Sequence, residues 1–106
     1  MHKPYFAEAY INKGASLATL GKYEDAMENF DIAIKYEPNN PEAYYNKGIA
    51  LTNLGYIQDA IKSYDTAIRY RPKYAAAYHN KGLILAALGQ FQKAIENFDL
   101  AINTNQ

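Results

Sequence analysis

The sequence predicts an all-α fold in which six helices form three stacked hairpins, and two observations lead to this prediction. Nearly the same words recur every 34 residues, as AYINKGASLATLG at 9–21, AYYNKGIALTNLG at 43–55 and AYHNKGLILAALG at 77–89. The segments at 22–38, 56–72 and 91–103 also align with one another without gaps. A period of about 20 to 50 residues is typical of stacked units, each of which cannot bury its apolar face alone.

The first helix of each unit has start and end signals, which are clearest in the second unit. Asn40 is a residue type that caps helices, Pro41 suits the first turn, and Glu42 places an acid where the helix dipole favours one. Apolar residues then follow at helical spacing up to Gly55, a residue type that adopts the left-handed conformation needed to end a helix. The aligned segments of the other two units are expected to form the same helix.

A second helix follows in each unit, and its sequence has one apolar stripe. In the second unit this stripe consists of five residues at helical spacing: Ala60, Ile61, Tyr64, Ala67 and Ile68. Pro72 closes the segment because proline cannot continue a helix. Acidic residues precede basic ones by four positions, Asp31 before Lys35 and Asp65 before Arg69, and we expect these pairs on the exposed surface. Each unit is therefore predicted to be a helical hairpin.

The positions that stay constant between the units resemble the pattern of the tetratricopeptide repeat family over residues 7–106. They hold aromatics, glycines, leucines, alanines and a closing proline: Tyr10, Tyr44, Tyr78; Gly14, Gly48, Gly82; Leu17, Leu51, Leu85; Ala26, Ala60, Ala94; Phe30, Tyr64, Phe98; Ala33, Ala67, Ala101; Pro38 and Pro72. The resemblance implies a right-handed superhelical solenoid of three helix-turn-helix repeats at residues 7–40, 41–74 and 75–106, after an N-terminal extension at residues 1–6.

One position departs from the family pattern, because lysine replaces its leucine in every unit, at Lys13, Lys47 and Lys81. On a helical wheel, these lysines lie at the edge of the face of the first helix that we expect to pack against other helices. We expect their methylenes to cover the adjacent helix while the ammonium groups reach water. The lysines are therefore predicted to be structural.

Variation between the units predicts which face of each first helix is open. On a helical wheel of about 100° per residue, the constant Tyr44, Gly48 and Leu51 share one arc, whereas the varied Tyr45 and Ile49 lie on another. A position packed against identical neighbours should repeat, so the varied arc is expected to be exposed. The resemblance implies that this arc lines a concave groove where ligands lie.

An asparagine on the open arc is constant in all three units, at Asn12, Asn46 and Asn80. We expect these residues to form a ladder whose side-chain amides bind the backbone of an extended peptide, as the resemblance implies. The alternatives are recent duplication and an asparagine that bonds to a neighbouring helix. The other residues predicted to bind peptide are nearly all uncharged, which predicts a largely uncharged ligand: Ile11, Ala15, Tyr45, Ile49, Asn53, His79 and Leu83.

Some members of the resembled family clamp the terminal carboxylates of heat-shock chaperones with lysine, asparagine and arginine side chains. The corresponding positions here hold Ile11, Ala15, Asn46, Ala76 and Asn80. Only Asn46 fits that pattern. The sequence therefore argues against a carboxylate clamp in this register.

The composition limits the functions open to this chain of 106 residues. Lysine plus arginine number 11 and aspartate plus glutamate number 11, so no net field attracts nucleic acid or anionic membranes. Cysteine is absent and neither His2 nor His79 has a partner at metal-ligand spacing, so no metal or other cofactor is expected. The scattered serine and threonine hydroxyls lack a neighbouring base and acid, so we do not expect an enzyme.

Neither a membrane-spanning segment nor a signal peptide is expected from the sequence. No run of about 18 apolar residues is present for a membrane span, and MHKPYFAEAY lacks the apolar core of a signal peptide. The sequence does not decide the cellular compartment of the protein, although it favours the cytoplasm.

The sequence thus predicts a protein-interaction module or scaffold that binds a peptide segment of a partner protein in its concave groove. One alternative is a structural unit that self-assembles by stacking end to end. RNA binding is a further alternative, against which the zero net charge argues.

The end of the third unit suggests self-association. Four apolar residues share one stripe of the final helix: Phe91, Ile95, Phe98 and Ile102. No capping helix follows before Gln106, although terminal repeats usually need a polar outer face. We expect the chain to be a fragment of a longer array, or else the stripe to meet another molecule, such as a neighbour's first helix near Tyr10 and Leu17.

Overall fold

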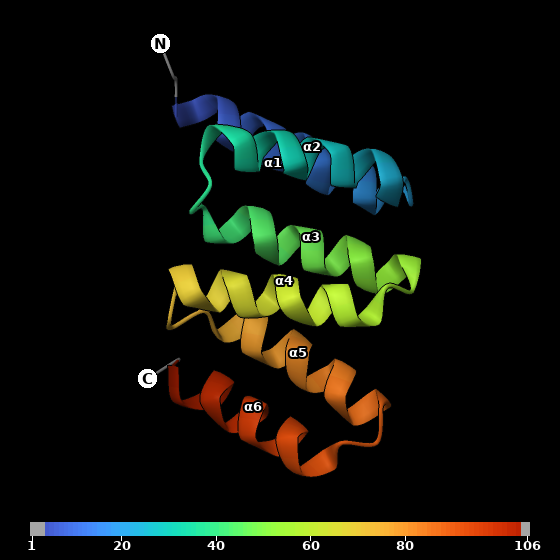
Figure 1. Ribbon diagram of the computed structural model, residues 1–106, viewed down its shortest axis with the longest axis vertical. Coiled ribbons are helices and arrows are strands. Elements are labelled where there is room, and N and C mark those ends of the chain that lie inside the picture. Colours follow the sequence, from blue (N-terminus) through green and yellow to red (C-terminus); the bar gives the residue numbers. More distant parts are fainter. Residues whose placement is uncertain (1–3, 105–106) are drawn as a thin grey trace.

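The computed structural model describes residues 4–104, which form six α-helices and no strand. The helices are α1 (Pro4–Thr19), α2 (Tyr23–Tyr36), α3 (Pro41–Leu54), α4 (Ile57–Tyr70), α5 (Ala75–Ala87) and α6 (Phe91–Thr104). They form three hairpins stacked along the long axis, from α1 and α2 at one end to α5 and α6 at the other (Figure 1). The predicted all-α solenoid is confirmed. Helix α1 begins at Pro4, inside the segment expected to be an N-terminal extension.

The helix ends follow the signals in the sequence. The Asn40 side chain accepts a hydrogen bond of 2.9 Å from the backbone N–H of Glu42 at the start of α3. Gly55 ends α3 with a φ of 88°, a left-handed conformation that only glycine adopts without strain, and its N–H bonds to the carbonyls of Leu51 and Thr52. Both predicted boundaries of α3 are therefore confirmed.

The two helices of a hairpin approach closely because a glycine on the first faces an aromatic ring on the second. A Cβ atom added to Gly48 would lie 2.7 Å from a ring carbon of Tyr64. The first hairpin has the same contact between Gly14 and Phe30. Tyr64 and Phe30 are the largest fully buried side chains, 2 % and 0 % exposed. Each ring thus fills the space that the missing glycine side chain leaves open.

Adjacent hairpins are joined by alanine-rich contacts and by ion pairs. Ala43 of α3 is buried against Ala7 and Ile11 of α1 and Ala33 of α2. Lys47 Nζ lies 2.8 Å from Asp31 Oδ1, which links α3 to α2.

The next hairpin repeats this ion pair, since Lys81 of α5 lies 2.6 Å from Asp65 of α4. The expected exposure of Asp31, Lys35, Asp65 and Arg69 is confirmed, but the two aspartates form no ion pair within their own helices. The lysine of the following repeat reaches each carboxylate instead, because hairpin stacking places the two side chains together.

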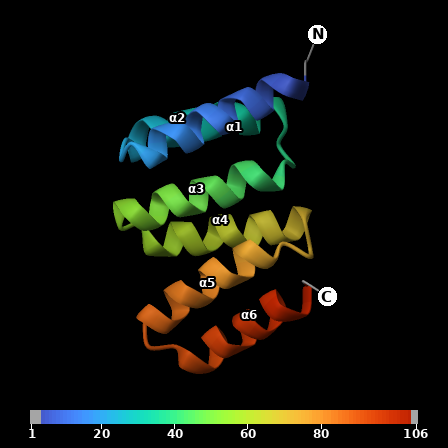
Figure 2. The same ribbon diagram turned by 180° about the vertical axis from the view of Figure 1, so that it is seen from behind.

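The stacking gives the molecule two different sides. The second helices α2 and α4 lie in front in Figure 1, whereas the first helices α1, α3 and α5 come forward in the reverse view of Figure 2. The molecule measures 45 × 28 × 18 Å along its principal axes. Within residues 4–104, no helix is both long and apolar enough to cross a membrane.

Candidate peptide-binding groove

Two adjoining hollows lie between residues of α3 and α5, and α4 contributes one side chain to each. One, of about 230 Å³, is lined by Ile49, Thr52, Asn53, Tyr64, Asn80, Leu83 and Ile84. The other, of the same volume of about 230 Å³, is lined by Thr52, Ile57, Leu83, Ile84, Ala87 and Leu88. Leu83 belongs to both walls and is 52 % exposed, so it presents apolar surface to solvent between them. None of these lining side chains carries a charge.

A cluster of tyrosines continues this surface toward the start of the helices. The Tyr45 ring of α3 lies 4.9 Å from the ring of Tyr74, which directly precedes α5, and 5.9 Å from the ring of Tyr64. Asn80 of α5 donates a hydrogen bond from Nδ2 to the Tyr45 hydroxyl at 3.2 Å, and a longer one to the Tyr64 hydroxyl at 3.5 Å. The guanidinium of Arg71 sits 4.4 Å from the centre of the Tyr74 ring. Side chains from three elements therefore hold Tyr45 in place.

Two tyrosines of this cluster, Tyr64 and Tyr74, have pKa values above the ordinary value of 10.0. Burial raises the pKa of Tyr74 to about 12, against the ordinary value of 10.0, and the nearby Arg71 acts in the opposite direction. Burial also raises the pKa of Tyr64, while hydrogen bonds with Thr52 and Asn80 oppose the rise. The hydroxyls of Tyr64 and Tyr74 can therefore take part in hydrogen bonds without adding charge to the surface.

The three repeated asparagines occupy different environments, although they hold the same position in the repeat. Asn46 donates from Nδ2 to the carbonyl of Glu42 in its own helix at 2.8 Å, while Asn12 is exposed. Asn80 alone reaches tyrosines, because Tyr45 and Tyr64 stand where the first repeat has Ile11 and Phe30, which carry no hydroxyl. For Asn80, the alternative of bonding to neighbouring helices holds in this structure.

Comparison with known families decides the identity of the repeat. A family model described as TPR repeat matches residues 14–55 and again 50–89, and a model described as tetratricopeptide repeat matches residues 75–106. The chain belongs to the tetratricopeptide repeat family. A comparison with curated protein sequences gave no significant match.

Several solved structures share this fold. The crystal structure of MamA is similar with a TM-score of 0.89 and 25 % identity, over 97 % of this chain and 60 % of MamA, so this chain spans less than two thirds of that protein. The TPR2B domain of yeast Sti1, solved in complex with pHsp70, gives a TM-score of 0.90 and 26 % identity over 95 % of this chain and 81 % of that one. The second tetratricopeptide domain of Spaghetti (RPAP3), bound to the HSP90 peptide SRMEEVD, has a TM-score of 0.88 at 23 % identity, over 95 % and 94 % of the two chains.

The tetratricopeptide fold brings together some of the residues predicted for the groove and separates others. Asn53, Ile49, Leu83 and Asn80 line one hollow, and Tyr45 adjoins it. His79 lies elsewhere, in a hollow between α5 and α6. Ala15 is half-buried on α1.

The predicted exposure of Ile11 is wrong, since only 7 % of its surface is accessible. It packs against Ala43 of the next hairpin, so variation at this position reflects a different packing solution and not an open surface.

Two tyrosines of this surface were missed by reasoning from the sequence. Tyr64 was assigned to the core alone, yet it also forms a wall of the hollow beside Asn80. Tyr74 was assigned no role, although its ring packs on Tyr45. The sequence contained one signal for this cluster. The second unit has tyrosines at positions 45 and 64, whereas the first unit has Ile11 and Phe30, which carry no hydroxyl.

Residues 4–104 contain no group of three or more His, Cys, Asp or Glu side chains that could hold a metal ion.

Proposed function

We propose that this chain is a protein-interaction module that binds a peptide segment of a partner protein on the surface between α3 and α5. The observation that carries the proposal is the pair of adjoining hollows around Leu83, which offers apolar walls beside amide and hydroxyl groups. Apolar pockets with a few polar groups are typical of ligand sites. The solved complexes of Sti1 and Spaghetti with chaperone segments support peptide binding as the mode of action.

The chemistry of the walls favours an uncharged segment with one bulky apolar side chain. Leu83, Ile84 and Ile57 would contact that side chain, because they line the more apolar of the two hollows. Asn53 would bind the peptide backbone through its amide oxygen, since its Nδ2 donates to the carbonyl of Ile49 in its own helix. We extend the same role to Asn46, whose Nδ2 is engaged in the same way.

An acidic chaperone tail is not the ligand that we propose. The positions at which family members carry a carboxylate clamp hold Ile11, Ala15 and Ala76, with asparagines at Asn46 and Asn80. A carboxylate placed there would lose water without gaining a cation. Selectivity would instead come from the shape of the hollows around Leu83.

The test is selection from a displayed library of short random peptides, followed by calorimetry on the best binder and on SRMEEVD as the acidic comparison. Leu83→Glu should weaken the selected peptide about tenfold or more, because it removes a buried apolar contact and introduces a charge. Leu100→Glu is the matched control, since Leu100 is an exposed leucine of α6 outside the groove, and it should leave binding unchanged. Tighter binding of SRMEEVD than of any uncharged peptide would contradict the proposal.

We further propose that the module acts by binding and not by catalysis. The hydroxyls of Thr19, Thr52 and Thr66 each donate to a carbonyl four residues earlier in the same helix. A hydroxyl engaged in this way is not poised beside a general base. Incubation of the module with its selected peptide, followed by mass spectrometry, should show an unchanged peptide mass.

A further inference from the structure

A separate hollow lies at the α5–α6 end of the stack, away from the groove. Its volume is about 630 Å³ and it is lined by Ala75, Ala76, His79, Phe98, Ala101 and Ile102. In the first hairpin, the positions 68 residues earlier are Ala7, Ile11, Ala33 and Ile34 for four of these residues. Those residues form a closed core cluster with Ala43 of α3. The hollow is therefore the α5–α6 equivalent of the site that Ala43 occupies on the first hairpin, and we call it the socket.

The structure contains a second, complementary element at its opposite end. Ala43 of α3 and Ala77 of α5 are completely buried against the preceding hairpin. The equivalent residue of α1, 34 positions before Ala43, is Ala9, and it is exposed. Ser16 is likewise exposed, whereas Ala50, its equivalent in α3, is buried. Helix α1 thus presents the face that α3 and α5 use for docking.

The side chains around the socket are apolar and more exposed than their counterparts. Ile95 and Ile102 of α6 are 51 % and 58 % exposed. Their equivalents in α4, Ile61 and Ile68, are half-buried and pack against the core cluster between the second and third hairpins. The difference in exposure arises because α5 covers the α4 residues, while no helix of residues 4–104 covers those of α6.

The two end faces, on α1 and on α6, also carry opposite charges at equivalent repeat positions. Lys47 pairs with Asp31 and Lys81 pairs with Asp65, so each first helix contributes a lysine to a carboxylate of the preceding hairpin. The same repeat positions at the two ends are Lys13 on α1 and Asp99 on α6, both exposed. Neither forms an ion pair within residues 4–104. A cation on one end of the stack therefore matches an anion on the other.

We propose that two copies of this chain associate head to tail, with α1 of one copy docked on α5 and α6 of the next. Ala9 fills the socket beside Ala101, and Lys13 pairs with Asp99. The contact reproduces the one that α3 makes on the first hairpin and that α5 makes on the second. Tyr10 and Leu17, the residues expected from the sequence to face a neighbour, are instead packed inside the first hairpin.

This contact joins two different surfaces. A pair of bound copies therefore still has one free socket, on one copy, and one free docking helix, on the other. A heterologous contact of this kind propagates into longer stacks. The two ends lie apart along the long axis (Figure 1), so a bound copy extends the stack lengthwise. The proposal uses surfaces other than the hollows around Leu83, so its failure would leave the proposed peptide site untouched.

The first test is sedimentation velocity of the 106-residue chain from micromolar to millimolar concentration. The parent protein should form species of increasing size. Ala9→Gln should weaken association about tenfold or more, because the longer side chain overfills the socket. Glu8→Gln introduces the same side chain at the neighbouring exposed position and should associate like the parent. Circular dichroism at micromolar concentration should show equal helix content for all three proteins.

The second test exchanges the charges. Lys13→Asp and Asp99→Lys should each weaken association about two- to fivefold, the range of an exposed ion pair. An equimolar mixture of the two variants should associate more strongly than either alone, because each junction between unlike copies then joins a cation to an anion. Lys62→Asp, at an exposed position in the middle of the stack, is the control for net charge and should not respond to mixing.

Two results would overturn the head-to-tail contact. One is a parent protein that stays monomeric at millimolar concentration. The other is association that proceeds equally well in Ala9→Gln and shows no gain on mixing the charge variants, which would point to two α6 faces meeting each other.

Discussion

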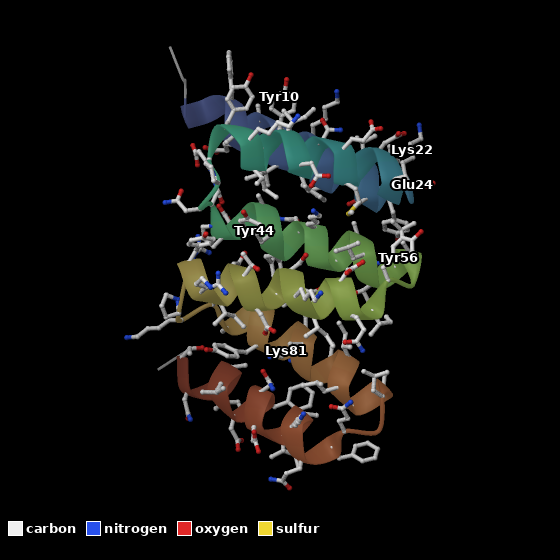
Figure 3. All side chains as sticks on the ribbon, viewed as in Figure 1. Tyr10, Lys22, Glu24, Tyr44, Tyr56 and Lys81 are labelled. Carbon is white, nitrogen blue, oxygen red and sulfur yellow. The ribbon has the colours of Figure 1, made fainter. Side chains whose placement is uncertain are left out.

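Lys81 Nζ lies 2.6 Å from Asp65 Oδ1, although the two residues are 16 positions apart and belong to different hairpins. Lys47 and Asp31 stand in the same relation one repeat earlier, at 2.8 Å. At Lys47 and Lys81, the constant lysine that departs from the family pattern thus links the second and third hairpins to the hairpin before each. Lys81 lies on α5 beside α4 in Figure 3, where the link crosses between the second and third hairpins.

Removal of this link should destabilise the stack modestly. Lys81→Met keeps most of the methylenes and removes the charge, so the free energy of unfolding should fall by about 0.2 to 1 kcal/mol, the range for solvent-exposed pairs. Urea unfolding in low and high salt measures the change, and the loss should shrink in high salt. Asp65→Asn together with Lys81→Met should cost little more than either change alone. Full additivity of the two losses would show that the pair does not act as a unit.

The close approach of α3 and α4 should make Gly48→Ala destabilising, although alanine normally favours a helix. The added Cβ would lie 2.7 Å from the Tyr64 ring, which is buried and cannot move away freely. We expect a loss of about 1 to 3 kcal/mol in the free energy of unfolding, measured by urea titration. In a Tyr64→Leu background the same substitution should cost clearly less, because the ring is gone. An equal cost in both backgrounds would rule out the steric explanation.

Asn80→Ala should lower stability, because its amide ties α5 to tyrosines of α3 and α4. A loss of about 0.5 to 1.5 kcal/mol corresponds to one hydrogen bond. The matched control is Asn53→Ala, whose amide bonds only within its own helix and whose removal should change stability by less than about 0.5 kcal/mol. Thermal unfolding of the two variants compares them directly. Equal melting temperatures would show that the contacts of Asn80 do not stabilise the stack.

Asn46→Ala should weaken the selected peptide about two- to twelvefold while leaving melting nearly unchanged. The reason is that its amide bonds only to its own helix, which leaves the side-chain oxygen for a ligand. Calorimetry and thermal unfolding measure the two quantities separately. A sharp fall in melting temperature with unchanged binding would assign Asn46 to the scaffold.

Stability should decrease at high pH because of three buried or partly buried tyrosines, Tyr44, Tyr64 and Tyr74. The pKa of Tyr74 is raised to about 12 in the folded protein, above the ordinary 10.0, so the folded state holds its proton more tightly than the unfolded state. The resulting stabilisation is complete below pH 10 and is lost as the pH rises from 10 to 12. Unfolding by urea at several pH values across this window should show a smaller decrease for Tyr74→Phe than for the parent. Tyr44 and Tyr64, whose pKa values burial also raises, should contribute to the remaining decrease in that variant.

The sequence alone was sufficient for the repeat, the six helices of residues 4–104 and the two ends of α3, although it did not predict that α1 begins at Pro4. Asn40, Gly55 and the apolar stripe around Tyr64 act within one or two helical turns, so their effect can be worked out from local spacing. The 34-residue period then determines that hairpins stack, because a single hairpin leaves its apolar face uncovered. Tyr10 and Tyr44, labelled in Figure 3, take equivalent places on α1 and α3 as the period requires.

Only the tertiary structure decided which neighbours the repeated positions meet. Asn46 and Asn80 are identical by position, yet one bonds to its own helix and the other to tyrosines, because the preceding hairpin differs at positions 11 and 45. The burial of Ile11 and the pairing of Asp65 with Lys81 likewise depend on contacts between hairpins. Distances between side chains from separate hairpins are set by how the helices pack, and local sequence spacing does not contain that information.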